Sequence, residues 1–163
     1  MKSKYLLPAL LFAISGVPAA DANVLGASEL QRCERIYDQL LQAREDTIAA
    51  NQGSASDKPT YECRAMMDVR VRLTTEVTGL VVYLVKDSIA TTDRGAEAAV
   101  NSSLSKATSM VESVLALIRK PVNVSGSCSY DSVVVATRKE LLRLADGVSD
   151  CVTSVKVKLS AAK

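Results

Sequence analysis

Two cysteines on one segment constrain the fold of this chain more than any other feature. Cys128 and Cys151 lie in a segment, 128–159, whose apolar residues recur every three or four positions, as on one face of a helix. That face comprises Tyr130, Val134, Thr137, Leu141, Leu144, Val148, Cys151, Val155 and Leu159. On a straight helix the two cysteines would be roughly 34 Å apart, whereas a disulfide needs Cα atoms about 4.4–6.8 Å apart. Each must therefore pair with a cysteine elsewhere in the chain.

The N-terminal residues have the pattern of a secretory signal peptide. A basic start precedes an apolar run over 5–17, and an A-x-A cleavage site ends at Ala22. The run is too short to span a bilayer, and no later segment approaches the roughly 20 apolar residues of a membrane helix. We therefore expect a signal peptide over 1–22 and a single helical domain over 23–163. The product should be secreted, extracellular (periplasmic if the source is bacterial), with no membrane insertion.

The four cysteines of the exported part indicate disulfides rather than a metal site. An even number of cysteines is typical of disulfides in a secreted chain. The sequence contains no histidine and no C-x-x-C pair, so the usual zinc ligand sets are missing. We expect no metal and no cofactor.

Two further segments also carry helical patterns. The first opens with a capping box at Ser28-Glu29-Leu30-Gln31 and ends at Asn51-Gln52-Gly53. The other should be capped by Thr92 or Asp93 and stopped by Pro121. Its expected apolar face is Ala96, Val100, Leu104, Ala107, Val111, Val114 and Ile118.

The segment between them allows two interpretations. Counted from Cys63, a helical face would contain Met66, Arg70, Leu73, Val77, Leu80 and Leu84. However, residues 69–73 alternate like a strand, 80–85 are rich in β-branched residues, and Gly79 could mark a turn. The alternative is thus an α+β fold with a β-hairpin at about 67–85. We favour the helix, because the other segments are helical and a lone hairpin is marginally stable.

Four amphipathic helices with short links predict an all-α fold, an antiparallel four-helix bundle with two disulfides. In that arrangement Cys33 and Cys151 lie at one end, whereas Cys63 and Cys128 lie at the other. The expected disulfides are therefore Cys33–Cys151 and Cys63–Cys128, one at each end of the bundle.

Composition excludes several functions. Without histidine there is no Ser–His or Cys–His nucleophile, and we expect no enzyme. A formal net charge of +2 gives no electrostatic footprint for nucleic acid. The sequence lacks tryptophan, and its one phenylalanine lies in the predicted signal peptide, so no aromatic platform for bases is expected.

Two features remain as candidate sites. Asn101 and Asn123 begin glycosylation sequons of a glycoprotein. An unusually apolar stretch could be a crowded core, a ligand cavity or a subunit interface; its residues are Val77, Leu80, Val81, Tyr83 and Leu84. The expected function is a secreted, disulfide-stabilised, non-enzymatic binding or interaction module with an unknown protein partner or an oligomer. The alternatives are a carrier of a small apolar ligand held between helices, and an inhibitor of a secreted enzyme.

Overall fold

The computed structural model describes residues 20–52, 58–92, 96–122 and 128–161. Within these ranges the chain forms four α-helices and no strand: α1 (Ala20–Gln52), α2 (Lys58–Thr92), α3 (Glu97–Arg119) and α4 (Ser132–Ala161), with a 3-10 turn, η1 (Cys128–Tyr130), before α4. The all-helical prediction is confirmed. The alternative, a β-hairpin at about 67–85, is wrong, because α2 runs unbroken through that segment.

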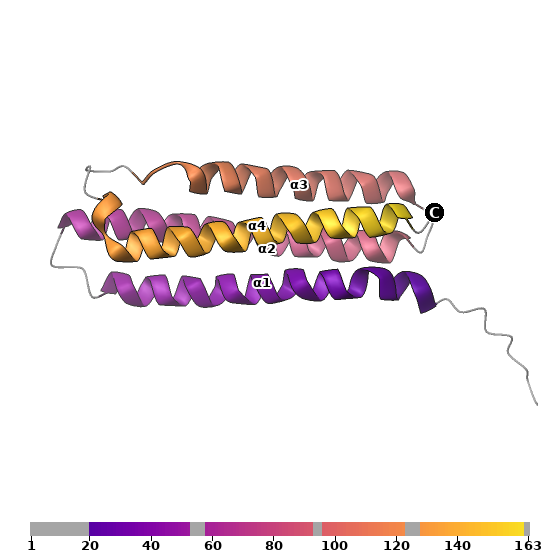
Figure 1. Ribbon diagram of the computed structural model, residues 1–163, viewed down its shortest axis with the longest axis horizontal. Coiled ribbons are helices and arrows are strands. Elements are labelled where there is room, and N and C mark those ends of the chain that lie inside the picture. Colours follow the sequence, from indigo (N-terminus) through magenta and orange to yellow (C-terminus); the bar gives the residue numbers. More distant parts are fainter. Residues whose placement is uncertain (1–19, 53–57, 93–95, 123–127, 162–163) are drawn as a thin grey trace, which may run out of the picture.

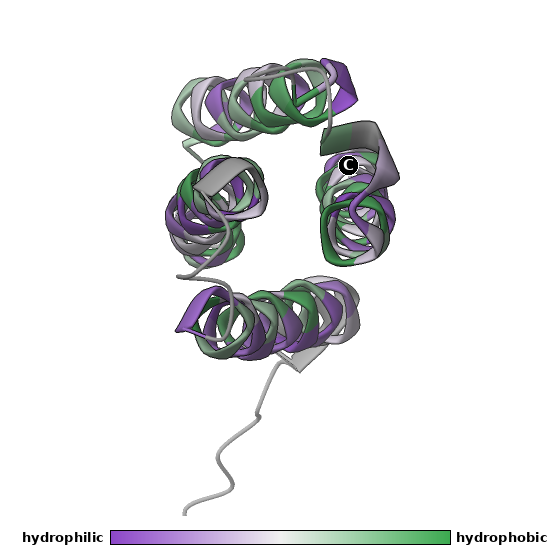
Figure 2. Ribbon diagram, turned by 90° about the vertical axis from the view of Figure 1, so that its left-hand side faces the viewer, coloured by the Kyte–Doolittle hydropathy of each residue, from purple (hydrophilic) through white to green (hydrophobic). Residues whose placement is uncertain are grey.

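The helices lie side by side along the long axis of the molecule (Figure 1). Figure 2 looks along them and places α3 and α1 at opposite corners, with α2 and α4 between them. Accordingly, α2 packs against α1, α3 and α4, while α1 and α3 make no direct contact in the described ranges. The helices thus form a bundle in which α2 and α4 approach each other across the middle.

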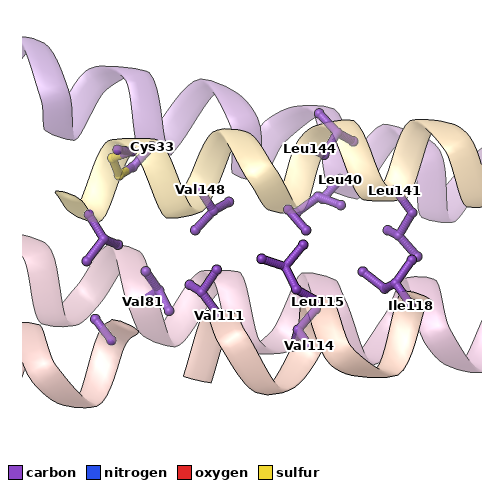
Figure 3. Close-up of a cluster of buried hydrophobic side chains, with 14 of the residues drawn as sticks. Cys33, Leu40, Val81, Val111, Val114, Leu115, Ile118, Leu141, Leu144 and Val148 are labelled. Atoms are coloured by element: carbon purple, nitrogen blue, oxygen red, sulfur yellow. A yellow bond between two sulfur atoms is a disulfide. The ribbon is translucent and has the colours of Figure 1, made fainter. Parts of the chain in front are cut away.

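The bundle interior is filled by aliphatic side chains from all four helices, several of which point toward one another in Figure 3. The predicted face of α3 is confirmed from Val100 to Ile118, with Leu115 added. The predicted face of α4 is buried from Val134 to Leu159 except at Thr137, which is half-buried. Tyr130 is wrongly placed on that face, because it precedes α4 and is 88 % exposed.

Two predicted helix starts are wrong. Ser28 does not cap α1, since α1 begins at Ala20 and the Ser28 hydroxyl donates to Glu29 within the helix. Thr92 ends α2 instead of capping α3; its hydroxyl donates to the Ser88 carbonyl. The alternative cap, Asp93, lies outside the described residues. The end of α3 is as predicted, because Lys120 is already extended before Pro121.

The sequence patterns did not predict the residue that caps the N-terminus of α4. Asp131 accepts a hydrogen bond from the Val134 backbone N–H at 2.9 Å, as an N-cap aspartate does. Its other carboxylate oxygen lies 3.1 Å from Arg64 Nε of α2, and Arg64 also donates to the Ala50 carbonyl near the end of α1. One aspartate and one arginine therefore link three helices at this end of the bundle.

Both expected disulfides are present. Cys33 and Cys151 join α1 to α4 with Cα atoms 5.9 Å apart, and Figure 3 shows this bond beside the core. Cys63 and Cys128 join α2 to the turn before α4 with Cα atoms 5.3 Å apart. No described cysteine is free. Since both bonds end on α4 or its entry turn, the last helix is tied to α1 and α2 by covalent bonds.

Candidate functional site

The apolar stretch that the sequence singles out is divided between two environments. Val81 is fully buried in the core, and Val77 and Leu84 are half-buried against it. Leu80 and Tyr83, in contrast, are 53 % and 66 % exposed. The structure therefore separates a core part of α2 from an outward-facing apolar part.

The outward part extends along most of α2. Met66, Val69 and Leu73 are also exposed, and with Leu80 and Tyr83 they form what we call the exposed α2 face. Their spacings of three, four, seven and three residues place them on one side of the helix. Large apolar side chains exposed singly are ordinary, but several on one side of a helix are typical of an interaction site.

This arrangement corrects the sequence-based assignment of the core. Met66, Leu73 and Leu80 were expected to face the interior, whereas the interior of α2 is formed one position further on. Its buried residues are Cys63, Met67, Asp68, Arg70, Val71, Thr74, Thr75, Thr78, Val81, Val85, Ser88 and Ile89, so Arg70 of the predicted face is buried as expected. Four of these are hydroxyl residues, and three of those donate to a backbone carbonyl four residues earlier. A threonine bonded in this way packs as a small apolar group, so hydropathy alone understates that face.

Charged side chains interrupt and border the exposed α2 face. Glu76 lies between Leu73 and Leu80 and is 3.6 Å from Arg44 of α1. Arg72 pairs with Asp68 at 2.9 Å. Both signs are therefore present beside the apolar row, as at the rim of a protein interface.

The border toward α1 is closely packed. A Cβ atom at Gly79 would lie 3.2 Å from the ring of Tyr37, so the absence of a side chain lets Tyr37 of α1 pack directly over α2. The exposed α2 face consequently belongs to a helix that is fixed on the bundle by tight neighbours.

On its other side the exposed α2 face borders a groove between α2 and α3. The groove has a volume of about 330 Å³ and is lined by Leu73, Val77, Ser109, Met110, Ser113, Val114 and Leu117. Its lining is mostly aliphatic. Its size falls at the lower end of the range for small-molecule sites.

The remaining predicted site residues are not assembled with this face. Asn101 is exposed near the start of α3, and Asn123 lies outside the described residues. The four cysteines are in disulfides. In the described ranges no group of three or more cysteines, aspartates and glutamates is arranged to hold a metal ion.

The shifted acidic groups lie in ion pairs on the helix surfaces. Hydrogen bonds from Lys158 and Ser28 lower the pKa of Glu29, and a hydrogen bond from Arg143 lowers the pKa of Glu140. These shifts favour the charged form of both carboxylates, which suits stabilising ion pairs rather than proton transfer near neutral pH.

No protein-family model, curated protein or solved structure matches this chain. Of the helices in the described part, none has the length and apolar character needed to cross a membrane. The candidate site is therefore defined by its own geometry: an exposed apolar row on α2, bordered by charges and by the α2–α3 groove.

Proposed function

We propose that this chain is a secreted, non-enzymatic interaction module, and that the exposed α2 face is its binding surface. In this proposal residues 1–22 are a signal peptide, and residues 23–163 form one antiparallel four-helix bundle. Asn101, which is exposed, and Asn123, on its sequon alone, are its proposed glycosylation sites. The two disulfides support export, because such bonds persist in oxidising compartments.

The observation that carries the proposal is the second apolar face of α2. One face of α2 is already buried against three helices, yet five large apolar side chains remain exposed on the other. A helix with apolar residues on more than one side either is buried on all sides or has a further partner. The exposed α2 face is not covered by α1, α3 or α4, so a binding partner is the simplest account of it.

The rest of the molecule is suited to presenting this face. The disulfides hold both ends of the bundle, and Tyr37 packs over Gly79 midway along α2. A rigid surface loses little conformational entropy on binding, which favours affinity.

Site-specific photo-crosslinking tests the proposal. A photoreactive amino acid would replace Leu80 in one variant and Ser105, an exposed residue of α3, in a matched control. We expect irradiation of the protein in its native extracellular medium to give a discrete adduct from position 80 and none from position 105. Adding Leu73→Glu to the first variant should remove the adduct. Equal adducts from both positions, or none from position 80, would contradict the proposal.

The α2–α3 groove favours a second candidate, a carrier for a small apolar ligand. Met110 and Leu117 of α3, with Val77 of α2, provide the aliphatic walls that such a ligand needs. Native mass spectrometry of the purified protein should then show a bound small molecule that is lost in Met110→Glu and retained in Leu80→Glu. A mass equal to that of the protein alone would contradict the carrier function.

A further inference from the structure

Seven positions of α2 follow a strict alternation of three- and four-residue steps, and all seven are exposed. They are Met66, Val69, Leu73, Glu76, Leu80, Tyr83 and Asp87, which we call the α2 seam. This alternation is the heptad pattern by which one helix packs along another. The seam covers three heptads, or roughly 32 Å of helix, so it matches a helix rather than a small ligand.

We propose that a second copy of this chain packs on the α2 seam, with the two α2 helices antiparallel about a twofold axis between Thr74 and Thr75. The inference rests on the proposed function, because it takes the exposed α2 face as the binding surface and names its occupant. A twofold dimer uses the same patch on both copies, so the patch must complement itself.

The seam meets this condition in one register. With the axis between Thr74 and Thr75, Met66 falls opposite Tyr83 of the second copy, and Val69 falls opposite Leu80. Leu73 falls opposite Glu76 of the second copy. Each exposed apolar residue except Leu73 therefore meets another apolar residue, and every such contact occurs twice.

The position of Glu76 favours this antiparallel register over a parallel one. In a parallel, in-register pair Glu76 would face Glu76 near the centre of the seam, whereas Asp87 would face an acidic residue in either arrangement. In the antiparallel pair Glu76 lies next to Arg72 of the second copy, which is exposed beside the seam. Opposite charges at such flanking positions set the orientation of paired helices.

One contact in the antiparallel register is unfavourable, and it makes the register testable. Asp87 falls opposite Glu62 of the second copy, near each end of the seam. Reversing that charge by Asp87→Lys should tighten an antiparallel dimer, because lysine then faces glutamate. In a parallel dimer the same change would place two lysines opposite each other and give no gain.

Sedimentation equilibrium of the purified protein, with both disulfides intact, tests whether a second copy packs on the α2 seam. We expect a monomer–dimer equilibrium that Leu80→Glu weakens roughly 100-fold or more, because two buried leucines are lost in a symmetric dimer. The matched control is Val157→Glu on α4, where Val157 is similarly exposed at 61 %. It should leave the dimer unchanged. Circular dichroism and thermal unfolding would show that both variants remain folded, since both positions are exposed.

Engineered cysteines test the register. Val69→Cys combined with Leu80→Cys should give a covalent dimer on mild oxidation, with the two native disulfides retained in a peptide map. Val69→Cys alone should not, because its Cα would lie about 16 Å along the axis from its copy, too far for a disulfide. Crosslinking by the single variant, or no crosslinking by the double one, would overturn the antiparallel arrangement.

The failure of this inference can be distinguished from failure of the proposed function. A protein that stays monomeric at every concentration, or a dimer unaffected by Leu80→Glu, overturns the second copy as occupant. If photo-crosslinking at position 80 then gives an adduct with a different protein, the binding surface stands and only its occupant changes. If it gives no adduct, both proposals fail.

Discussion

Arg70 of α2 and Arg138 of α4 donate to four consecutive carbonyl groups at the end of α3. Arg70 reaches the Lys120 and Pro121 carbonyls at 2.6 and 3.1 Å, and Arg138 reaches the Ile118 and Arg119 carbonyls at 3.0 and 2.5 Å. The last carbonyls of a helix lack partners within the helix and carry its negative partial charge. Two arginines from neighbouring helices therefore satisfy the end of α3 and dock it on the bundle.

We predict that Arg70→Met destabilises the protein by about 2–3 kcal/mol, because the Lys120 and Pro121 carbonyls both lose a charged donor. Arg70 is only 6 % exposed, and burial, followed by the nearby charge of Arg138, lowers its pKa while leaving it ionised. Chemical denaturation measures the loss. The control is Arg119→Met, which removes the exposed ion pair that Arg119 forms with Asp146 at 3.6 Å. This change should lower the free energy of unfolding by less than about 1 kcal/mol. Equal losses in the two variants would contradict a capping role for Arg70.

The hydrogen bonds of Arg70 explain why a charged residue occupies a core position in the sequence pattern of α2. The pattern of α2 placed Arg70 in a core position, where an unpaired charge is not expected. The position is indeed buried, but the partners that make it tolerable come from 50 residues away, at the end of α3. No local pattern could reveal them, whereas Asp131, the cap of α4, stands two residues before an apolar run and could have been recognised.

The disulfide pairing could be predicted because it depends only on helix lengths and order. The rise of a helix fixes the height of each cysteine along the bundle. One pairing joins cysteines of equal height, Cys33 with Cys151 and Cys63 with Cys128, and both bonds are present. The faces of α3 and α4 were predictable for a similar reason, since each has one apolar stripe. On α2 two stripes compete, and hydropathy selected one that includes the exposed Met66, Leu73 and Leu80, because threonines occupy part of the buried stripe.

The two disulfides should stabilise opposite ends of the bundle independently. They close loops of 118 and 65 residues, so each should contribute about 4 kcal/mol through the unfolded chain. Because that contribution is global, the local effect is measured on amides that exchange through local opening. In the double variant Cys33→Ser/Cys151→Ser we expect these amides to exchange faster around those positions and at an unchanged rate near Cys63. The variant Cys63→Ser/Cys128→Ser should show the reverse. Exchange that rises equally at both ends in either variant would refute independent clamps.

Acid should destabilise the fold partly through Glu29. Its pKa is lowered mainly by the hydrogen bond from Lys158, which lies 2.5 Å from Glu29 Oε1. At pH values between this lowered pKa and the ordinary glutamate pKa, the folded state therefore binds fewer protons than the unfolded state. The free energy of unfolding rises with pH there. The contribution is present above the ordinary glutamate pKa and is lost as pH falls below about 4.5 through the lower folded value.

The corresponding variant is Glu29→Gln, with Glu34→Gln, an exposed glutamate on the same helix, as control. We expect Glu29→Gln to reduce the free energy of unfolding at pH 7 by about 0.5–1 kcal/mol, and to flatten its decline below pH 4.5. The control should retain the wild-type slope. Denaturant titrations across pH would measure both, and parallel slopes for all three proteins would exclude Glu29 as a contributor.

Neighbouring residues on α2 test most directly whether this helix has two apolar faces with different roles. Val81 is fully buried, whereas Leu80, the preceding residue, is 53 % exposed. The measurement is the free energy of unfolding of Val81→Ala and Leu80→Ala, taken at a concentration low enough to keep the chain monomeric. We predict a loss of about 2 kcal/mol for Val81→Ala and less than about 0.5 kcal/mol for Leu80→Ala. Equal losses would make Leu80 part of the folding core and would contradict a second face reserved for a partner.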